Sequence, residues 1–302
     1  MTAPTVYTGC CDASAGVALG TNLFAAADDE GNQIRFYRAD ADGPPQQVVD
    51  VSAFLRLTGR FPEMDLEGAA WLGDKIFWIS SHGRNREGKY RPNRHCFFAT
   101  KVQQTNELVR LLPVGLCYRS LLTDLMLDAR LRPFNLATAS ARPPKSKDAL
   151  NLEGLCATAE GHLLLGFRNP IPQGRALLVP LLNPEEVIRG WPAKLGAPVL
   201  LDLGGLGIRD LGYWQKKIWI LAGPYDSEKT FRLYVWSGDT DTPKAIEDLD
   251  FRGLTPEALV FYPEKGQFQI LSDDGTLKTR GVECKRLPDP AQKRFRSVWI
   301  TP

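Results

Sequence analysis

The sequence predicts an all-β protein, a β-propeller with five four-stranded blades, from three observations. One motif recurs five times along the chain, further short apolar runs follow each copy, and a spare strand precedes the first copy. A period of about 50 residues that holds four strands is typical of a propeller blade. Because closed all-β architectures often run to about 250 residues or more around one core, we expect a single domain over residues 1–302.

The inner strand of each blade is predicted from the recurring motif, which opens with a polar or acidic residue and continues with small and apolar residues. Its five copies start at Asp12, Asp65, Asn151, Gly207 and Thr255. The second and third copies read Asp-Leu-Glu-Gly and Asn-Leu-Glu-Gly, which is nearly one motif. Short apolar runs between turn residues are typical of buried strands.

The outer strands follow each copy in order. Second strands are predicted within residues 22–29, 75–82, 162–169, 217–224 and 267–274. Third strands are predicted at 33–38, 96–102, 176–182, 231–236 and 295–300, and fourth strands at 47–51, 108–114, 198–203 and 245–249. The fifth blade has no fourth strand of its own, so we expect residues 5–8 to pair with residues 295–300. Such pairing closes the ring and covers an exposed sheet edge.

An insertion interrupts the repeat at residues 116–150. The copies that start at Asp65 and Asn151 are 86 residues apart, well beyond the spacing of the other copies. Residues 118–130 have helix-like apolar spacing, and residues 142–148 are typical of a polar loop. We expect the insertion to cover one face with few core contacts, so that its deletion leaves the propeller folded and its surface is open to a protein partner. A degenerate sixth blade is the alternative.

Composition narrows the classes of partner and location. The chain has 37 basic and 35 acidic residues, a net charge of +2, so we expect no nucleic-acid partner and no membrane. No run approaches the roughly 18 apolar residues of a membrane span, and the N-terminus lacks a signal-peptide pattern, so we expect a cytoplasmic protein. The six cysteines lack zinc-type spacing, and adjacent Cys10 and Cys11 are expected to be reduced thiols rather than a redox-active pair.

Charged residues are expected to gather at one mouth of the central channel. In a four-stranded blade the inner strand starts, and the second strand ends, on the same face, so these loops converge from all blades. The residues predicted there are Asp12, Asp28, Asp29, Glu30, Asp65, Glu67, Ser81, His82, Arg84, Asn85, Glu153, Arg168, Asn169, Arg209, Asp210, Tyr225, Asp226, Glu257, Asp273 and Asp274. Crowded carboxylates raise one another's pKa unless a cation or basic side chains compensate.

Three roles are assigned within this mouth. Proton transfer and water activation are expected from the candidate catalytic residues His82, Glu67 and Glu153, since the unperturbed pKa of histidine lies near neutrality. Carboxylate oxygens suit Ca²⁺ or Mg²⁺, so a divalent cation is the expected cofactor, and no organic cofactor is expected. Its candidate ligands are Asp65, Glu67, Glu153, Glu257 and Asp273. A small anionic molecule is the expected substrate, and its candidate binding residues are Arg84, Arg168, Asn169, Arg209 and Tyr225.

Three glutamates occupy the same place in their repeats. Glu67, Glu153 and Glu257 each lie two residues into a copy, so we expect them around one funnel with Arg168 and Arg209 within salt-bridge reach. Buried carboxylates need compensating charge, which this alternation of sign supplies. The alternative is that these residues form ion pairs that only lock neighbouring blades together.

The same segments resemble a bacterial family described as domain of unknown function 3616, whose neighbours include phytase-like esterase propellers. The matching stretches begin at Asp12, Asp28, Asp65, Ser81, Asn151, Gly166, Gly205 and Leu271. The resemblance implies the propeller and a relationship to hydrolases, by analogy of fold, and carries over no catalytic residue.

Two functions remain open. The first is a metal-assisted hydrolase of a small phosphoester or carboxylic ester, acting in the charged pocket at the mouth of the channel. The second is a non-catalytic propeller that binds a ligand or a protein at the same mouth, because no recognised nucleophile and base motif occurs in the chain.

Overall fold

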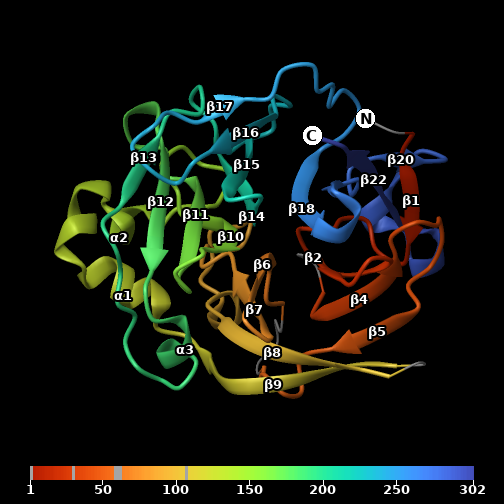
Figure 1. The fold of residues 1–302 in the computed structure, drawn as a ribbon, viewed down its shortest axis with the longest axis horizontal. Coiled ribbons are helices and arrows are strands. Elements are labelled where there is room, and N and C mark those ends of the chain that lie inside the picture. The colour runs from red at the N-terminus through yellow and green to blue at the C-terminus, as the bar shows by residue number, and fades with distance from the viewer. Residues whose placement is uncertain (1–2, 29–30, 58–62, 106–107) are drawn as a thin grey trace.

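Five four-stranded antiparallel sheets are arranged around a central axis in the computed structural model, which describes residues 3–28, 31–57, 63–105 and 108–302 (Figure 1). Blade 1 contains β2 (Ala15–Leu19), β3 (Leu23–Ala27), β4 (Gln33–Arg38) and β5 (Gln47–Asp50). Blade 2 contains β6 (Leu66–Leu72), β7 (Lys75–Ser80), β8 (Phe97–Gln104) and β9 (Val109–Tyr118). Blade 3 contains β10 (Asn151–Ala157), β11 (Leu163–Asn169), β12 (Ala176–Leu181) and β13 (Val199–Leu201).

The last two blades complete the ring. Blade 4 contains β14 (Gly207–Trp214), β15 (Lys217–Gly223), β16 (Arg232–Trp236) and β17 (Lys244–Ala245). Blade 5 contains β18 (Pro256–Tyr262), β19 (Gln267–Ser272), β22 (Arg294–Ile300) and β1 (Thr5–Thr8), and a two-stranded hairpin of β20 (Lys278–Thr279) and β21 (Val282–Glu283) lies between β19 and β22 in the chain. Each inner strand contacts the inner strands of the neighbouring blades. The predicted five-bladed propeller is confirmed.

The ring closes as predicted, by pairing of the N-terminal strand with the last blade. Strand β1 runs antiparallel to β22, with Thr5 opposite Ser297 and Thr8 opposite Arg294. Gln269 fastens the joint from β19, because its side-chain amide donates to the Tyr7 hydroxyl at 2.8 Å and to the Ser297 hydroxyl at 3.1 Å. The first described residues and the C-terminus both lie at this blade (Figure 1).

A disulfide between Cys11 and Cys284 adds a covalent link near the closure. The prediction that Cys11 is a reduced thiol is therefore wrong, and spacing could not reveal a partner 273 residues away in the chain. Cys10 is a free thiol, buried beside the Tyr37 hydroxyl. Disulfides persist mainly in oxidising compartments. The disulfide therefore does not support the predicted cytoplasmic location, which stays a prediction. Within the described residues, no helix is long and apolar enough to cross a membrane.

The insertion is partly helical, as predicted, and its helices are packed against blade 3. It contains α1 (Leu121–Leu127), the 3₁₀ helix η2 (Ala129–Phe134) and α2 (Leu136–Ala139). Leu121, Leu125 and Leu131 are buried in one cluster with the leucines of β10, β11 and β12. Figure 1 shows α1 and α2 on the outside of the ring beside β12. The expectation of few core contacts is wrong, because deletion would expose the apolar surface that these leucines cover.

Short helices occupy several loops. A third α-helix, α3 (Pro184–Val187), lies between β12 and β13. The remaining 3₁₀ helices are η1 (Pro92–Arg94), η3 (Pro172–Gly174), η4 (Pro263–Lys265), η5 (Cys284–Arg286) and η6 (Pro290–Gln292). Helix η1 precedes β8 and thereby places Arg94 near the start of the inner strand of blade 2.

Candidate functional site

Four of the five inner strands carry the same irregularity near their start, a β-bulge. In β6, β10, β14 and β18 the pairing with the second strand of the blade skips one residue. The skipped residues are Glu67, Glu153, Arg209 and Glu257. A bulge leaves its extra residue outside the ladder and redirects its side chain. All four residues consequently line one basin at this mouth of the channel.

The glycine after the bulge explains the repeated Glu-Gly pair. A Cβ at Gly68 would lie 2.9 Å from the Glu153 carbonyl oxygen on the neighbouring inner strand. A Cβ at Gly154 would lie 2.7 Å from Cγ2 of Ile208 on the next strand. Neighbouring inner strands therefore approach closely at these positions, and glycine leaves room for that approach.

The basin has a volume of about 710 Å³ and brings together most of the predicted charged residues. The predicted site residues that line it are Asp65, Glu67, Glu153, Arg168, Arg209, Glu257 and Asp273. From the wider set, Asp12, Asn85 and Asp226 line it as well. Asp29 and Glu30 lie outside the described residues.

A buried chain of ion pairs crosses the floor of the basin. Arg168 Nη1 lies 2.6 Å from Glu153 Oε1, and Arg209 Nη1 lies 3.1 Å from Glu153 Oε2. The other nitrogen of the Arg209 guanidinium pairs with Glu257. The side-chain amide of Asn151 also donates to Glu153, at 2.6 Å. Both arginines therefore lie within salt-bridge reach of Glu153, as predicted, and Arg209 also reaches Glu257.

Burial and charge act in opposite directions on Arg209. Loss of water lowers its pKa, and the positive charge of Arg168 lowers it further, whereas the charges of Glu153 and Glu67 raise it. Glu67 thus contributes electrostatically to the same floor. Because one guanidinium bridges glutamates from two blades, it neutralises carboxylates that would otherwise repel each other.

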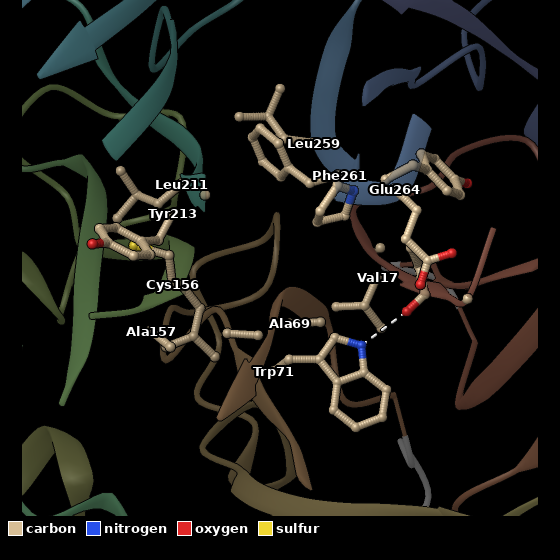
Figure 2. A pocket seen from close by; sticks show the side chains of 18 of the residues that line it. Val17, Ala69, Trp71, Cys156, Ala157, Leu211, Tyr213, Leu259, Phe261 and Glu264 are labelled. Carbon is tan, nitrogen blue, oxygen red and sulfur yellow. Dashed lines mark hydrogen bonds between the residues drawn. The ribbon is translucent and has the colours of Figure 1, made fainter. Parts of the chain in front are cut away.

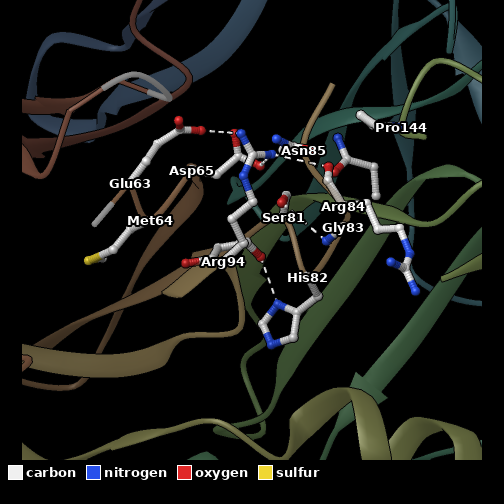
Figure 3. Close-up of polar contacts among 12 residues, drawn as sticks. Glu63, Met64, Asp65, Ser81, His82, Gly83, Arg84, Asn85, Arg94 and Pro144 are labelled. Carbon is white, nitrogen blue, oxygen red and sulfur yellow. Dashed lines mark hydrogen bonds and ion pairs between the residues drawn. The ribbon is translucent and has the colours of Figure 1, made fainter. Parts of the chain in front are cut away.

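A second ion-pair group lies on the wall of blade 2, where Arg94 binds Asp65 and Glu63 (Figure 3). Arg94 Nη1 lies 2.5 Å from Asp65 Oδ2. Burial raises the pKa of Asp65 to about 6, although the guanidinium of Arg94 opposes the rise. Asp65 also adopts a left-handed backbone conformation, with φ of 58°. A carboxyl group that titrates near neutrality at a basin wall is suited to proton transfer.

A cationic corner, formed by Lys145, Arg168 and Lys285, lies beside the buried chain. Lys145 comes from the insertion and Lys285 from η5. Loss of water around the ammonium group lowers the pKa of Lys145, and the charges of Arg168, Lys285 and Arg209 lower it further. Asp273 opposes this shift. Neither lysine forms an ion pair with any residue that the structure describes, so the corner holds positive charge with incomplete compensation.

His82 does not reach the basin, which corrects the expectation that it faces the mouth. Its side chain is fully buried, and its Nδ1 lies 2.8 Å from the carbonyl oxygen of Ser80. Figure 3 shows the imidazole pointing away from Asp65 and from the guanidinium of Arg94. Burial, followed by the charge of His95, lowers the pKa of His82 to about 3. His82 is therefore neutral and out of reach of a ligand in the basin.

Three predicted substrate-binding residues also lie outside the lining of the basin. Arg84 donates from Nε to the Ser140 carbonyl at 2.9 Å, and Asn169 donates from its amide to the Pro144 carbonyl at 2.9 Å. These two side chains hold the insertion against blades 2 and 3. Tyr225 is half-buried and does not line the basin, although its neighbour Asp226 does.

Several carboxylates and hydroxyls of the wider predicted set have structural contacts instead. Asp210 is buried and accepts hydrogen bonds from the backbone amides of Leu211 and Leu259, each at 2.7 Å, so it joins blades 4 and 5. Burial raises its pKa well above the usual value. Asp28 pairs with Arg35, Asp274 accepts from Arg296 at 2.6 and 2.8 Å, and Ser81 accepts from the amide of Gly83 at 3.2 Å.

The carboxylates are arranged for guanidinium groups rather than for a metal ion. Among the described residues, no group of three or more Asp, Glu, His or Cys side chains is placed to hold a metal. Asp65, Glu153 and Glu257 each already pair with an arginine. These residues do not fit a divalent cation as they stand, and the Ca²⁺ or Mg²⁺ site stays a prediction.

The family model described as Protein of unknown function (DUF3616) matches residues 99–250, half of the chain. The chain belongs to this family. The description of the family names no activity, so membership adds no catalytic residue to the basin. The relationship to phytase-like esterase propellers stays a prediction, and no curated protein matches the chain.

Solved propeller structures are similar to this DUF3616 protein at low identity. A putative oxidoreductase (glucose dehydrogenase) from Thermus thermophilus is 14% identical, with 99% of this chain and 100% of that chain covered and a TM-score of 0.45. A gluconolactonase from Xanthomonas campestris is 12% identical, with 89% and 73% covered and a TM-score of 0.41. A thermostable family-43 glycoside hydrolase is 9% identical, with 88% and 83% covered and a TM-score of 0.45.

Among the described residues, eight charged side chains that line the basin were not predicted from the sequence. They are Glu63, Arg86, Glu87, Arg94, Lys145, Glu228, Lys229 and Lys285. Arg94 and Lys285 each lie in a 3₁₀ helix outside the repeated motif. Lys145 and Lys285 carried no recognisable signal, because only the folded insertion and η5 bring them to Arg168. A search for basic residues in the loop before a third strand would have found Arg94.

Proposed function

We propose that the basin binds a small anionic molecule whose negative group lies in the cationic corner. The observation that carries this proposal is that Lys145, Lys285 and Arg168 line the same basin, where loss of water around Lys145, followed by the charges of Arg168 and Lys285, lowers its pKa. An anion between these groups would relieve their repulsion and accept charge-assisted hydrogen bonds from two ammonium groups. Arg168 is already paired with Glu153, so the two lysines supply the free positive charge.

The rest of the basin favours a ligand that also carries hydroxyl groups. Glu67, Glu257 and Asp226 line it together with Asn85 and Ser14. Carboxylate and amide oxygens accept hydrogen bonds from hydroxyl groups, whereas they repel a second negative charge. A hydroxylated carboxylic acid or a phosphate ester therefore matches the basin better than a polyanion.

Titration calorimetry with three related compounds tests the proposal. Glycerol 3-phosphate and glycerate should bind, whereas glycerol, which has the same carbon skeleton without the charge, should bind far more weakly. Lys145→Met and Lys285→Met should each weaken anion binding by about fivefold, since one charge at about 4 Å in water contributes about 1 kcal/mol. Lys147→Met is the matched control, because Lys147 lies in the same insertion but not in the basin lining.

Two results would overturn the proposal. The first is no binding of either anion at millimolar concentration, and the second is an equal loss of affinity in Lys145→Met and Lys147→Met. Binding should also weaken with added salt, because exposed charges are screened.

Hydrolysis of a bound ester is the second candidate, favoured by the raised pKa of Asp65 at the basin wall. A carboxyl group that is half protonated at about pH 6 can donate a proton to a leaving group, as general acid catalysis requires. Glu67 and Glu153 remain the candidate bases that would activate water.

Turnover of 4-nitrophenyl phosphate and 4-nitrophenyl acetate, measured with and without Ca²⁺ or Mg²⁺, tests this candidate. Activity that falls as the pH rises through about 6, and that Asp65→Asn abolishes while anion binding persists, would support it. The absence of any turnover that depends on Asp65 or Glu153 would leave binding as the function.

A further inference from the structure

A second cavity of about 400 Å³ opens at the other end of the inner strands. The basin lies where these strands start, whereas this cavity is lined by residues from their middle and their ends, such as Val17, Trp71, Leu155, Leu211 and Leu259. All five inner strands contribute to it, and its walls are mainly apolar. Its volume falls in the range of about 300 to 1,000 Å³ that is usual for small-molecule sites.

The aromatic walls are held in place without a ligand. The indole nitrogen of Trp71 donates to the Ala18 carbonyl on the neighbouring blade at 2.8 Å, and Figure 2 shows the indole at the edge of the open space. The Phe261 ring packs on Phe268, with centroids 5.1 Å apart. A Cβ at Gly212 would overlap the Phe261 ring, so glycine admits that ring to the wall. A preformed wall costs little ordering on binding.

The charge at this cavity has one sign. Glu264 is the one charged side chain among the described residues that line it, and no lysine, arginine or histidine accompanies it there. Glu264 is exposed and forms no ion pair with any described residue. The ammonium group of the adjacent Lys265 lies over the rings of Tyr262 and Trp299, at 5.7 and 5.2 Å from their centroids.

Exposed aromatic surface reinforces the preference for a cation. Trp71 and Tyr213 are 37% and 38% exposed, on different sides of the opening (Figure 2). Indole and phenol faces attract ammonium groups through the negative potential above the ring. A ligand with an apolar ring could fill the cavity with that ring and place an amine beside Glu264.

We propose that this cavity is a second ligand site, which binds a small arylalkylamine. The aromatic ring of the ligand lies among the aliphatic side chains of the inner strands, and its ammonium group lies between Glu264 and the exposed aromatic faces. This site is separate from the charged basin, so the proposal stands or falls independently of anion binding.

Three probes that share one ring and a similar chain test the class of ligand. They are phenethylamine, phenethyl alcohol and 3-phenylpropionate, measured by ligand-observed NMR and by tryptophan emission. The amine should bind tightest and the carboxylate weakest. Glu264→Gln should weaken amine binding by about fivefold, as the loss of one water-exposed charge predicts, and should leave the alcohol unchanged.

Two further variants locate the probe. Ala157→Leu fills space at the cavity wall and should weaken all three probes, whereas Ala141→Leu, at an exposed position in the insertion, should change none. Trp71→Phe should remove the emission change caused by phenethylamine. The proposal is overturned if no probe binds at millimolar concentration, if Ala157→Leu leaves binding unchanged, or if amine and carboxylate bind equally.

Discussion

Replacement of Arg209 by methionine should destabilise the protein strongly, because it leaves two buried glutamates without their shared cation. Arg209 is 7% exposed, and its Nη1 lies 3.1 Å from Glu153 Oε2. At an effective dielectric constant of about 20, Coulomb's law assigns about 5 kcal/mol to unit charges at that distance. Relief of the desolvation of the guanidinium offsets part of this energy, so a net loss of about 3 to 5 kcal/mol is expected.

The effect should depend on pH with a definite sign. Without the guanidinium, Glu153 and Glu257 acquire raised pKa values in the folded state. The stability that their protonation provides is present at low pH and is lost as the pH rises through those values. Arg209→Met should therefore lose more free energy of unfolding at about pH 8 than at about pH 5.

Urea unfolding monitored by circular dichroism measures this loss at both pH values. Arg252→Met is the matched control, because Arg252 pairs with Asp250 on the surface with its side chain 91% exposed, and no measurable change is expected. Adding Glu257→Gln to Arg209→Met should recover part of the loss, since Glu153 keeps Arg168 as its partner and the unpaired carboxylate of Glu257 is removed. A loss below about 1 kcal/mol that is equal at both pH values would refute the reasoning.

Three other outcomes are expected. Burial lowers the pKa of His82 to about 3 and that of His95 to about 4, below the unfolded value of 6.5. The free energy of unfolding should therefore fall as the pH is lowered, by roughly 2 kcal/mol for each histidine at about pH 5. In urea unfolding, His82→Asn should make the free energy of unfolding less dependent on pH. Non-reducing peptide mapping should recover a peptide linked through Cys11 and Cys284, and reduction should lower the free energy of unfolding by about 3 to 5 kcal/mol. Alkylation of both thiols without reductant would contradict the disulfide. Gly154→Ala should cost about 1 to 3 kcal/mol in the same assay, because the added methyl overlaps Ile208, and an unchanged midpoint would show that the inner strands can separate.

The fold could be predicted because its signal is local and repeated. Apolar runs between turns mark the strands, and the spare strand at residues 5–8 pairs with β22 as expected. The packing of the insertion was harder to predict. Its buried leucines have the spacing of any amphipathic helix, and no residue nearby in the sequence shows which surface they cover. The ends of outer strands also differ from the predicted ones. The fourth strand of blade 4 was predicted at residues 245–249, whereas β17 spans only Lys244–Ala245.

The site could be predicted in part, for the same reason. Glu67, Glu153 and Glu257 share a motif position, and symmetry of the blades then places them together. His82 follows the end of β7, where the residue after the strand was expected to face the mouth, but a left-handed backbone turns it inward, with φ of 54°. The lysines of the cationic corner are brought together by tertiary contacts that leave no pattern in the sequence.

The repeated bulge fixes the position of a side chain at the basin floor through the backbone, whatever the identity of that side chain. Each of the four positions is set by backbone pairing within its own blade, so exchanging Glu67 for another residue need not disturb the position of Arg209 or Glu257. The three glutamates and one arginine are thus one of many possible arrangements that the same ring can carry. Among relatives built on this chain, combined substitutions at these positions that keep each buried charge compensated could change the charge of the basin floor while the propeller stays intact, so divergence in ligand should appear first there.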